Sequence, residues 1–394
     1  MIIVKILFLL LFIYLATSIV WLLLIAIAGR FGKLCVYKVN PVKKRIAVII
    51  PSYKEDAIIT DTALKASQHN YPRDKFSVLV VADKLQAETV AQLRQIPVQV
   101  LEADVNMKSR SVNAAMRYLN ENDFDIAVIL DADNIMGNDC LEKINDAFVQ
   151  GCQAMQCHRT AKNQQTSVAL LDAISEEINI NLFRRGTAVI GISAAPVGSG
   201  MAFSFPLLKQ IFSVEHILNN PGEDREIDMQ LMKQKVFMHF IDDAWVFDEK
   251  VANAGVFEKQ RVRWLEAQIN HIRRFSDADM KNAPRTTIYW VKYLQNFLLP
   301  RLLFIMLLGI LFALVLAQWV FKFNILTPEP NWWLLIMIMY AAALALSVPG
   351  RFYSTATLKA VIQIPVLMLS MIKAILKIKT GRQEFIHTPK TYKP

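Results

Sequence analysis

Cysteine and histidine are scarce in this chain, and their spacing argues against zinc-stabilised and disulfide-stabilised folds. The 394 residues include 4 cysteines and 6 histidines. No Cys-x-x-Cys pair occurs and no histidine cluster lies beside a cysteine, so we expect neither zinc nor disulfide bonds. This usage agrees with a reducing compartment. Internal repeats and low-complexity linkers are also missing, which favours one main domain.

Charged residues are absent between Ile6 and Ala28. An apolar stretch of this length can cross a hydrocarbon core of about 30 Å. The alternative is a secretory signal peptide, but a signal core is usually about 7 to 15 residues long, and no small-x-small cleavage site follows here. We therefore predict an N-terminal transmembrane helix in residues 1–29.

Two further apolar stretches, Leu302 to Val320 and Trp332 to Val348, are separated by a loop whose one basic residue is Lys322. Such a charge-poor loop is typical of the translocated side. In contrast, basic residues crowd the segment after the first stretch: Arg30, Lys33, Lys38, Lys43, Lys44 and Arg45. The sequence thus predicts an integral membrane protein whose main domain is cytoplasmic, and the compact layout suggests a bacterial inner membrane.

Residues 357–378, within a C-terminal membrane region of residues 281–394, allow two interpretations. Lysines and Pro365 interrupt this apolar segment, which favours a helix lying in the membrane interface. The alternative is a fourth span, which would place the carboxyl end outside. The net charge of +10 follows from the basic residues that flank the membrane segments and would meet anionic lipids, so nucleic acid is not implied.

Between residues 45 and 275, apolar strand-like runs alternate with helical patterns. This alternation predicts an α/β domain, a mostly parallel sheet with helices on both faces. The expected strands are Ile46–Pro51, Ser77–Ala82, Val98–Leu101 and Ile126–Leu130. Ser109–Asn120 is an expected helix, because apolar residues recur there at helical spacing.

Polar residues follow these strands, at the edge where open α/β sheets bind ligands. The candidates to contact a nucleotide are Pro51, Ser52, Tyr53 and Glu55 after the first strand, Asp83 after the second, and Lys108 with Asn113 in the next helix. The alternatives are a turn or cap role for Asp83 and a solvated Lys108. After the fourth strand, Asp131 and Asp133 can hold Mg²⁺ or Mn²⁺ against a diphosphate, although an ordinary turn can carry such a pair too.

Two more motifs lie further along the chain. Glu223 and Asp224 follow a glycine, and they can also be acidic residues that simply open a helix. Gln260, Arg263 and Trp264 share one helical face, because residues three and four apart are neighbours. Arg263 can offer a fork of donors to a diphosphate, while the other two can form the floor for an acceptor sugar. Core packing is the alternative for the tryptophan.

Together these motifs resemble those of the membrane-bound family 2 glycosyltransferases, the group of cellulose, hyaluronan and poly-N-acetylglucosamine synthases and of ceramide glucosyltransferase. The resemblance covers residues 45–275 and implies a GT-A fold and a UDP-sugar donor. It implies that Asp83 contacts the uridine and that Asp131 and Asp133 handle diphosphate and metal. Asp224 is the implied catalytic base, chosen over Glu223 because the family places its base at the second position.

The same resemblance implies further contacts. Glu223 would lie on the acceptor side. Gly198-Ser199-Gly200-Met201 resembles the family's small-residue acceptor loop, in which Gly200 allows a close approach of the sugar, although any tight turn would also use these glycines. Near the carboxyl end, residues 385–390 resemble the gating loop of some processive synthases, with Phe385, Thr388 and Lys390 at the matching positions.

Three functions remain open at this point. The first is an inverting transferase that extends a polysaccharide, with export or assembly subunits as candidate partners. The second is an enzyme that adds one sugar to a lipid acceptor, which needs the same carboxylates but no channel. The third, an inactive nucleotide-sugar sensor or assembly partner, is disfavoured because Asp131, Asp133 and Asp224 are all present. Either enzyme would use Mg²⁺ or Mn²⁺ as cofactor.

Overall fold

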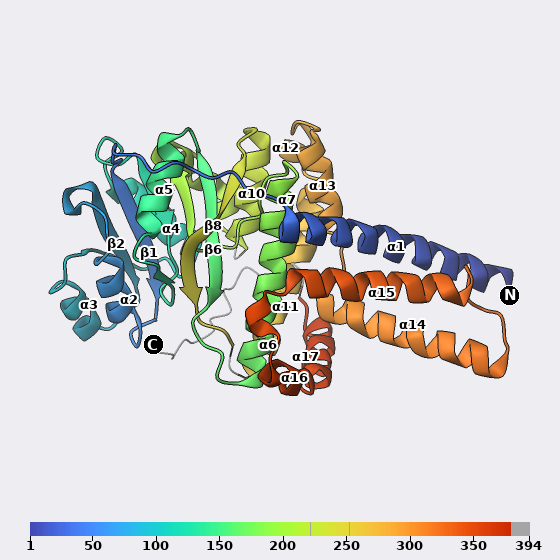
Figure 1. Ribbon diagram of the computed structural model, residues 1–394. Helices are drawn as coiled ribbons and strands as arrows, with labels where there is room; N and C mark the ends of the chain where they lie inside the picture. The colour runs from blue at the N-terminus through green and yellow to red at the C-terminus, as the bar shows by residue number, and fades with distance from the viewer. Residues whose placement is uncertain (221, 252, 380–394) are drawn as a thin grey trace.

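One eight-stranded sheet forms the centre of the main domain (Figure 1). The computed structural model describes residues 1–220, 222–251 and 253–379. Within these residues the strand order is β3-β2-β1-β4-β7-β6-β8-β5. The strands are β1 (Ile46–Tyr53), β2 (Phe76–Asp83), β3 (Gln99–Ala103), β4 (Ile126–Ile129), β5 (Ile135–Met136), β6 (Ala154–Ala161), β7 (Met201–Ser204) and β8 (Met238–Asp248).

Helices surround this sheet and connect it to a bundle of longer helices. Those of the domain are α2 (Ile59–Ala66), α3 (Ala87–Leu93), α4 (Lys108–Tyr118), α5 (Cys140–Val149), α6 (Ser167–Ile180), α7 (Gly186–Val189), α8 (Phe205–Phe212), α9 (Glu215–Leu218), α10 (Glu223–Lys233), α11 (Ala254–Arg274) and α12 (Ala278–Lys281). Those that follow are α13 (Thr287–Gln295), α14 (Arg301–Phe321), α15 (Pro330–Ser347), α16 (Thr355–Val361) and α17 (Ile364–Leu376). Three short helices complete them: η1 (Arg73–Lys75), the π-helix η2 (Asn181–Arg185) and η3 (Gly350–Phe352).

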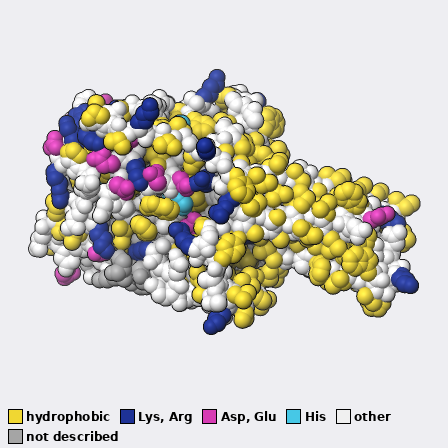
Figure 2. All heavy atoms as spheres, viewed as in Figure 1, with side chains coloured by type: hydrophobic (Ala, Val, Ile, Leu, Met, Phe, Trp, Pro, Cys, Tyr) yellow, Lys and Arg dark blue, Asp and Glu magenta, His cyan; other side chains and the backbone are white. Residues whose placement is uncertain are grey.

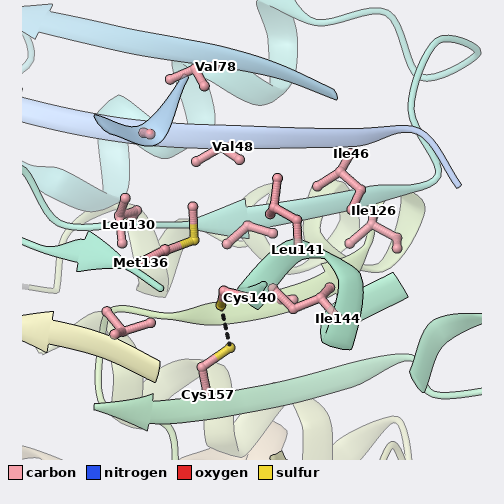
Figure 3. Close-up of a cluster of buried hydrophobic side chains, with 14 of the residues drawn as sticks. Ile46, Val48, Val78, Ile126, Leu130, Met136, Cys140, Leu141, Ile144 and Cys157 are labelled. Atoms are coloured by element: carbon pink, nitrogen blue, oxygen red, sulfur yellow. Dashed lines mark hydrogen bonds between the residues drawn. The ribbon is translucent and has the colours of Figure 1, made fainter. Parts of the chain in front are cut away.

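Strand β1 shows why helices cover both faces of the sheet. Successive side chains of a strand point to opposite faces. Ile46 and Val48 pack on one face with residues of α2 and α5, whereas Ala47 and Ile49 pack on the other with residues of α4 and α8. Figure 3 shows the first of these cores, where Leu141 of α5 lies against the sheet. A strand buried on both faces has to be apolar throughout, which is why its sequence was recognisable.

Sulfur atoms contribute to the same core as free thiols. The Sγ atoms of Cys140 and Cys157 are 3.9 Å apart, a thiol contact marked by the dashed line in Figure 3. Cys35 and Cys152 are free as well. The buried thiols therefore behave as small apolar side chains that fill the space between α5 and β6.

The predicted α/β class is confirmed, and the second half of the sheet adds antiparallel pairing. β1 runs parallel to β2 and β4, and β2 to β3, as expected for the four predicted strands. β6 and β8 are also parallel, but β7 is antiparallel to both of its neighbours, and β5 is antiparallel to β8. Strand β6 escaped prediction because buried polar residues such as Gln156 and His158 interrupt its apolar pattern.

Three helices, α1 (Ile2–Phe31), α14 and α15, extend from the domain to one side (Figure 1). Each is long and apolar enough to cross a membrane. Helix α14 alone has 21 residues, or about 31 Å of helix. Inside the bundle, Phe8 and Phe12 of α1 meet the fully buried ring of Trp333 edge-on. On the face seen in Figure 2, hydrophobic side chains cover this projection, whereas charges gather on the domain and near the far tip.

Helices α16 and α17 lie beside the domain, where the bundle begins (Figure 1). They are bent by 46° at the break between them. α16 packs on α6, and α17 packs along α11, where Met371 and Ala374 meet Val262 and Leu265. The ammonium of Lys377 also lies 2.6 Å from a carboxylate oxygen of Glu258. The interfacial placement of residues 357–378 stays a prediction, and this packing on the domain is compatible with it.

The link between domain and bundle is a close approach of α1 to η2. The Nδ2 atom of Asn181 donates to the Ala26 carbonyl at 3.3 Å and to the Ser347 hydroxyl at 3.0 Å, so one side chain joins α1 and α15. Next to it, Arg185 Nε donates to the Gly29 carbonyl at 2.5 Å. A methyl group on Gly29 would lie 2.3 Å from Asn181 Oδ1 and 2.7 Å from the Asn181 carbonyl oxygen. The absence of a side chain at Gly29 therefore permits the docking.

We predict that Gly29→Ala destabilises the protein by about 1–3 kcal/mol, the usual cost of overpacking, because the added methyl separates α1 from η2. Thermal unfolding in detergent would measure this. Gly309→Ala in α14 is the matched control, because a Cβ there meets nothing within 4 Å among the described residues. Equal melting temperatures for the two variants would contradict the proposed role of Gly29.

Candidate active site

A cavity of about 770 Å³ lies at the carboxyl ends of β1 and β4 and extends to the apolar helices α1, α14 and α15. At its polar end, the walls include Ser52, which lies near the end of β1, and Asp131, which follows β4. At its other end they include Leu22 of α1, Phe304 of α14 and Tyr340 of α15. One space therefore connects the sheet edge, where α/β domains bind ligands, with the apolar bundle.

The Lys108 ammonium lies among the carboxylates at the polar end. Its Nζ is 2.5 Å from Asp131 Oδ1 and 3.0 Å from Glu223 Oε1, and it donates to the Gly198 carbonyl at 2.6 Å. Burial by itself would lower the pKa of Lys108, but Asp131 and Glu223 outweigh it and raise that pKa above its ordinary value. Lys108 thus stays charged and holds the start of α4 against the end of β4 and the start of α10.

Glu223 and Asp224 occupy different environments although they are neighbours in sequence. Glu223 is buried, and burial raises the pKa of its carboxyl while Lys108 opposes the rise. Asp224 also lines the cavity, and its Oδ1 accepts the backbone N–H of Arg225 at 2.8 Å. Both residues lie in the first turn of α10, where the helix dipole favours negative charge. Glu223 and Asp224 therefore do open a helix, as the alternative interpretation expected, and this position is compatible with a role in catalysis or binding.

All four predicted nucleotide contacts at the end of β1, namely Pro51, Ser52, Tyr53 and Glu55, line the cavity. Asp83 is not among the lining residues. Its fully buried carboxylate accepts the backbone N–H groups of Val105 at 3.3 Å and Asn106 at 2.7 Å. Burial raises the pKa of Asp83, and these two N–H groups act against that rise. In this structure Asp83 fixes the loop before α4, so its uridine contact stays a prediction.

Two other predicted contacts point into the protein. Asn113 Nδ2 donates to the Phe212 carbonyl at the end of α8, and Asn113 does not line the cavity, so it ties two helices together. Gly200 has a left-handed φ of +64°, and a Cβ there would lie 2.9 Å from Val246 Cγ2. It is also not a lining residue, whereas Gly198 is. The close packing of Gly200 against β8 accounts for its lack of a side chain.

Helix α11 brings Gln260, Arg263 and Trp264 to the same cavity, as their spacing predicted. The Gln260 Oε1 atom is buried and accepts no hydrogen bond from the described residues. Burial lowers the pKa of Arg263, although Glu223, Asp131 and Asp224 raise it. The Arg263 guanidinium therefore interacts electrostatically with all three carboxylates.

The arginine inside the same motif, Arg261, carries a role that the sequence did not reveal. Its Nη2 donates to Asp172 Oδ1 of α6 at 2.6 Å, and its guanidinium carbon lies 3.9 Å from the ring centre of Trp264 and 4.3 Å from that of Phe257. Stacking on a guanidinium fixes the plane of an aromatic ring. Asp172 thus positions Trp264 through Arg261.

A second group of buried charges lies next to this pair. Arg159 of β6 contacts both carboxylate oxygens of Glu176, each at 3.2 Å, and Lys250 lies 2.7 Å from Asp248 and 3.6 Å from Glu176. Burial alone would raise the pKa of Glu176, but Arg159 and Lys250 lower it to about 2. Asp172 and Glu176 lie four residues apart on α6. Acidic residues at this spacing in a mostly apolar helix were the sequence signal that could have indicated buried ion pairs.

The described residues contain no group of three histidine, cysteine or acidic side chains arranged to hold a metal ion. Two carboxylates, Asp131 and Asp133, do line the cavity beside one another. Such oxygen donors suit Mg²⁺ or Mn²⁺, which bind through one or two carboxylates when phosphate oxygens and water complete their coordination. When the side-chain amide of Asn134 is oriented so that its oxygen accepts a hydrogen bond from the Ser199 hydroxyl, its nitrogen donates to Asp133 Oδ1 at 3.1 Å and to Asp248 Oδ1 at 3.2 Å. The pair therefore fits a cation that a diphosphate helps to bind.

The family model described as "Glycosyltransferase like family 2" matches residues 43–267, more than half of the chain. The chain belongs to this family. It is a nucleotide-sugar-dependent glycosyltransferase, and the matched region contains the sheet, the cavity carboxylates and the Gln260-x-x-Arg263-Trp264 motif. A search of curated proteins finds no match to this sequence.

Solved structures resemble the glycosyltransferase in fold. The mannosyltransferase PcManGT from Pyrobaculum calidifontis, in complex with GDP-mannose and Mn²⁺, is 16% identical, with a TM-score of 0.56 over 95% of this chain and 98% of that one. Glucosyl-3-phosphoglycerate synthase from Mycobacterium tuberculosis, with Mn²⁺ and UDP, is 13% identical over 58% of this chain and 80% of that one, with a TM-score of 0.39. TarS residues 1–349 from S. aureus is 11% identical over 86% and 93%, with a TM-score of 0.43. The first of these confirms the GT-A fold.

We predict that Asp172→Asn lowers transferase activity at least tenfold and stability by roughly 3 kcal/mol, because breaking a buried ion pair costs about 3–5 kcal/mol. The change keeps the shape of the side chain but leaves Arg261 without its counter-charge. Activity and thermal unfolding would be measured on the same preparation. Asp61→Asn, which removes a partly exposed pair with Lys65 on α2, is the control and should change neither. Equal behaviour of the two variants would contradict the positioning role.

Proposed function

We propose that this glycosyltransferase transfers one sugar from a UDP-sugar to the hydroxyl of a membrane lipid. The observation that carries the proposal is the single cavity that links the Asp131 and Asp224 carboxylates to the membrane helices. Its far end has apolar walls: Leu22, Phe304, Ile305, Ala343, Leu344, Leu367 and Met371. Such walls suit a hydrocarbon chain better than the many hydroxyls of a sugar polymer.

Asp224 is the proposed catalytic base. It lines the cavity, and its carboxylate has a local backbone N–H as the hydrogen-bond donor among the described residues. An inverting transfer needs a carboxylate that takes the acceptor hydroxyl's proton while that oxygen attacks the anomeric carbon. Glu223 is less suited because its carboxylate already pairs with Lys108.

The donor diphosphate is proposed to lie between Arg263 and the Asp131–Asp133 pair. Arg263 offers planar N–H donors to phosphate oxygens. Asp131 and Asp133 would hold Mg²⁺ or Mn²⁺, which neutralises the charge that builds up on the departing diphosphate. Trp264, stacked on Arg261, would form a floor for the sugar ring near Gln260. The gating-like residues Phe385, Thr388 and Lys390 lie outside the described residues, so their role stays a sequence prediction.

The proposal also covers the location of the reaction. The domain would face the cytoplasm of a bacterial cell, where UDP-sugars are made, because basic residues dominate the segment between α1 and β1. Helices α16 and α17 would lie at the membrane surface, and lipid would enter the cavity between the helices that line it. Extension of a polysaccharide is the second candidate, supported by the cavity-lining Gln260 and Trp264 motif.

The test is transfer from radiolabelled UDP-sugars, with GDP-mannose as a further donor, in membranes that contain the protein. We expect label in a solvent-extractable product that carries a single sugar. Asp224→Asn should lower this transfer by about 10²- to 10⁴-fold, because general base catalysis contributes that much. Label in a long water-soluble chain would support the polysaccharide synthase instead. Absence of Asp224-dependent transfer from any donor would contradict both enzymatic proposals.

Metal removal gives a separate prediction. EDTA should abolish transfer, and Mn²⁺ or Mg²⁺ should restore it, because the diphosphate leaves poorly without a cation. Asp133→Asn should raise the Mn²⁺ concentration for half-maximal activity by at least the roughly 10- to 100-fold that loss of an outer-shell partner costs. Full activity in EDTA would show that Lys108 and Arg263 suffice.

A further inference from the structure

Arg301 is a cation at the membrane end of the cavity with neutral hydrogen-bond partners. It is the first residue of α14 and lines the cavity. Its Nη1 donates to the Ser175 carbonyl at 3.2 Å and hydroxyl at 2.7 Å, and its Nη2 donates to Asn179 Oδ1 at 2.6 Å. The described residues place no carboxylate in ion-pair contact with it, whereas Arg261 in the same cavity has Asp172.

A partly buried guanidinium whose hydrogen-bond partners are all neutral calls for an explanation, because Asp172 and Glu176 act on it electrostatically but form no ion pair with it. Removing a charge from water is costly unless an opposite charge accompanies it. Arg301 has five N–H donors, and three acceptor contacts from the described residues leave donors available. Arginine recognises phosphate with two parallel N–H bonds. An anionic group on the ligand would therefore supply the ion-pair partner that Arg301 lacks among the described residues.

Tyr340 of α15 adds a second donor. It lines the cavity, its ring stacks on Phe304 at 4.7 Å, and the phenol interacts electrostatically with Arg301. Its hydroxyl forms no hydrogen bond with the described residues. Around these two polar groups lie the apolar walls from α14, α15 and α17, including Leu344 and Leu367. The same site therefore offers donors for an anion and a surface for hydrocarbon.

We propose that Arg301 and Tyr340 bind the phosphate of the lipid acceptor, so that the acceptor is a phosphate-bearing lipid and not a neutral one. The inference rests on the proposed lipid transfer and narrows its substrate class. The hydrocarbon lies along the apolar walls, the phosphate meets Arg301, and the reacting hydroxyl is a different group of the same head, nearer Asp224. The donor diphosphate stays at Arg263 and the aspartate pair.

Binding of radiolabelled dodecyl phosphate to the purified full chain in detergent tests this site without any sugar transfer. We expect binding that unlabelled dodecyl phosphate displaces and that dodecanol, inorganic phosphate and UDP do not. Arg301→Gln should weaken it at least about tenfold, the usual value of a charge-assisted contact. Arg285→Gln, on the surface beside Tyr289, is the control and should leave it unchanged.

Two further variants separate binding from folding, because Arg301 also joins α14 to α6. Tyr340→Phe removes one hydroxyl and keeps the ring, so it should weaken dodecyl phosphate binding about two- to tenfold with an unchanged melting temperature. Arg301→Lys keeps the charge and should retain more binding than Arg301→Gln. Unchanged affinity in both Arg301→Gln and Tyr340→Phe would overturn the inference.

Competition distinguishes the possible sources of the phosphate. Displacement by inorganic phosphate at the same concentration would indicate a free-phosphate site, and displacement by UDP would assign Arg301 to the donor; either result overturns the lipid assignment. The outcome is also separable from the proposed function. A solvent-extractable glycolipid made equally well by wild type and Arg301→Gln, with Arg301-independent binding, would refute this inference and leave lipid transfer standing. Arg301-dependent binding without any glycolipid product would establish a phosphate-lipid site at Arg301 and contradict lipid transfer, so that the bound lipid would not be an acceptor.

Discussion

The contact of Lys108 with two carboxylates is the interaction on which the site depends. Asp131 comes from the end of β4 and Glu223 from the start of α10, and both would repel each other and Asp224 without a cation between them. Lys108 is the first residue of α4. The loop before α4, which Asp83 holds in place, therefore also sets the position of the Lys108 ammonium. The sheet edge, the loop at Gly198 and the start of α10 thus meet at the Lys108 ammonium.

A second constraint joins this polar centre to the membrane. Helix α6 supplies Asp172 to the motif helix and Ser175 and Asn179 to the first residue of α14, and it continues into η2, which docks on α1. One continuous segment therefore contacts both the helix that carries Gln260, Arg263 and Trp264 and the apolar helices α1, α14 and α15. Movement of the bundle relative to the domain would change the shape of the cavity at both ends, so the docking of α1 on η2 matters for transfer as well as for stability.

Much of the fold followed from local sequence patterns. The strands β1 to β4 and helices α1, α14 and α15 were predictable because each contains an apolar run. The sequence motifs also located Asp131, Asp224, Gln260, Arg263 and Trp264, all of which line one cavity. Strand β6 was missed because it carries buried polar residues, whose partners come from distant segments.

The remainder of the site depends on long-range packing that spacing does not encode. Asp172 and Arg261 are 89 positions apart, and nothing in either local pattern points to the other. Arg301 begins an apolar helix, where a basic residue is ordinary, and only the structure shows that its hydrogen-bond partners are neutral. In the opposite direction, Asn113 and Gly200 matched motifs whose positions here serve packing. The motifs therefore identified most of the candidate residues, and the fold decided which of them line the cavity.

The central claim is that a lipid acceptor occupies the cavity between the domain and the membrane helices. The most direct measurement places a photo-crosslinking amino acid at Leu344, which lines the cavity, and separately at Ile338, which is 67% exposed on the same helix and does not line it. After a reaction with radiolabelled UDP-sugar, illumination should attach the labelled lipid product to the protein at Leu344 and not at Ile338, and Asp224→Asn should remove the label. Equal labelling at both positions, or labelling by a sugar polymer alone, would contradict the account.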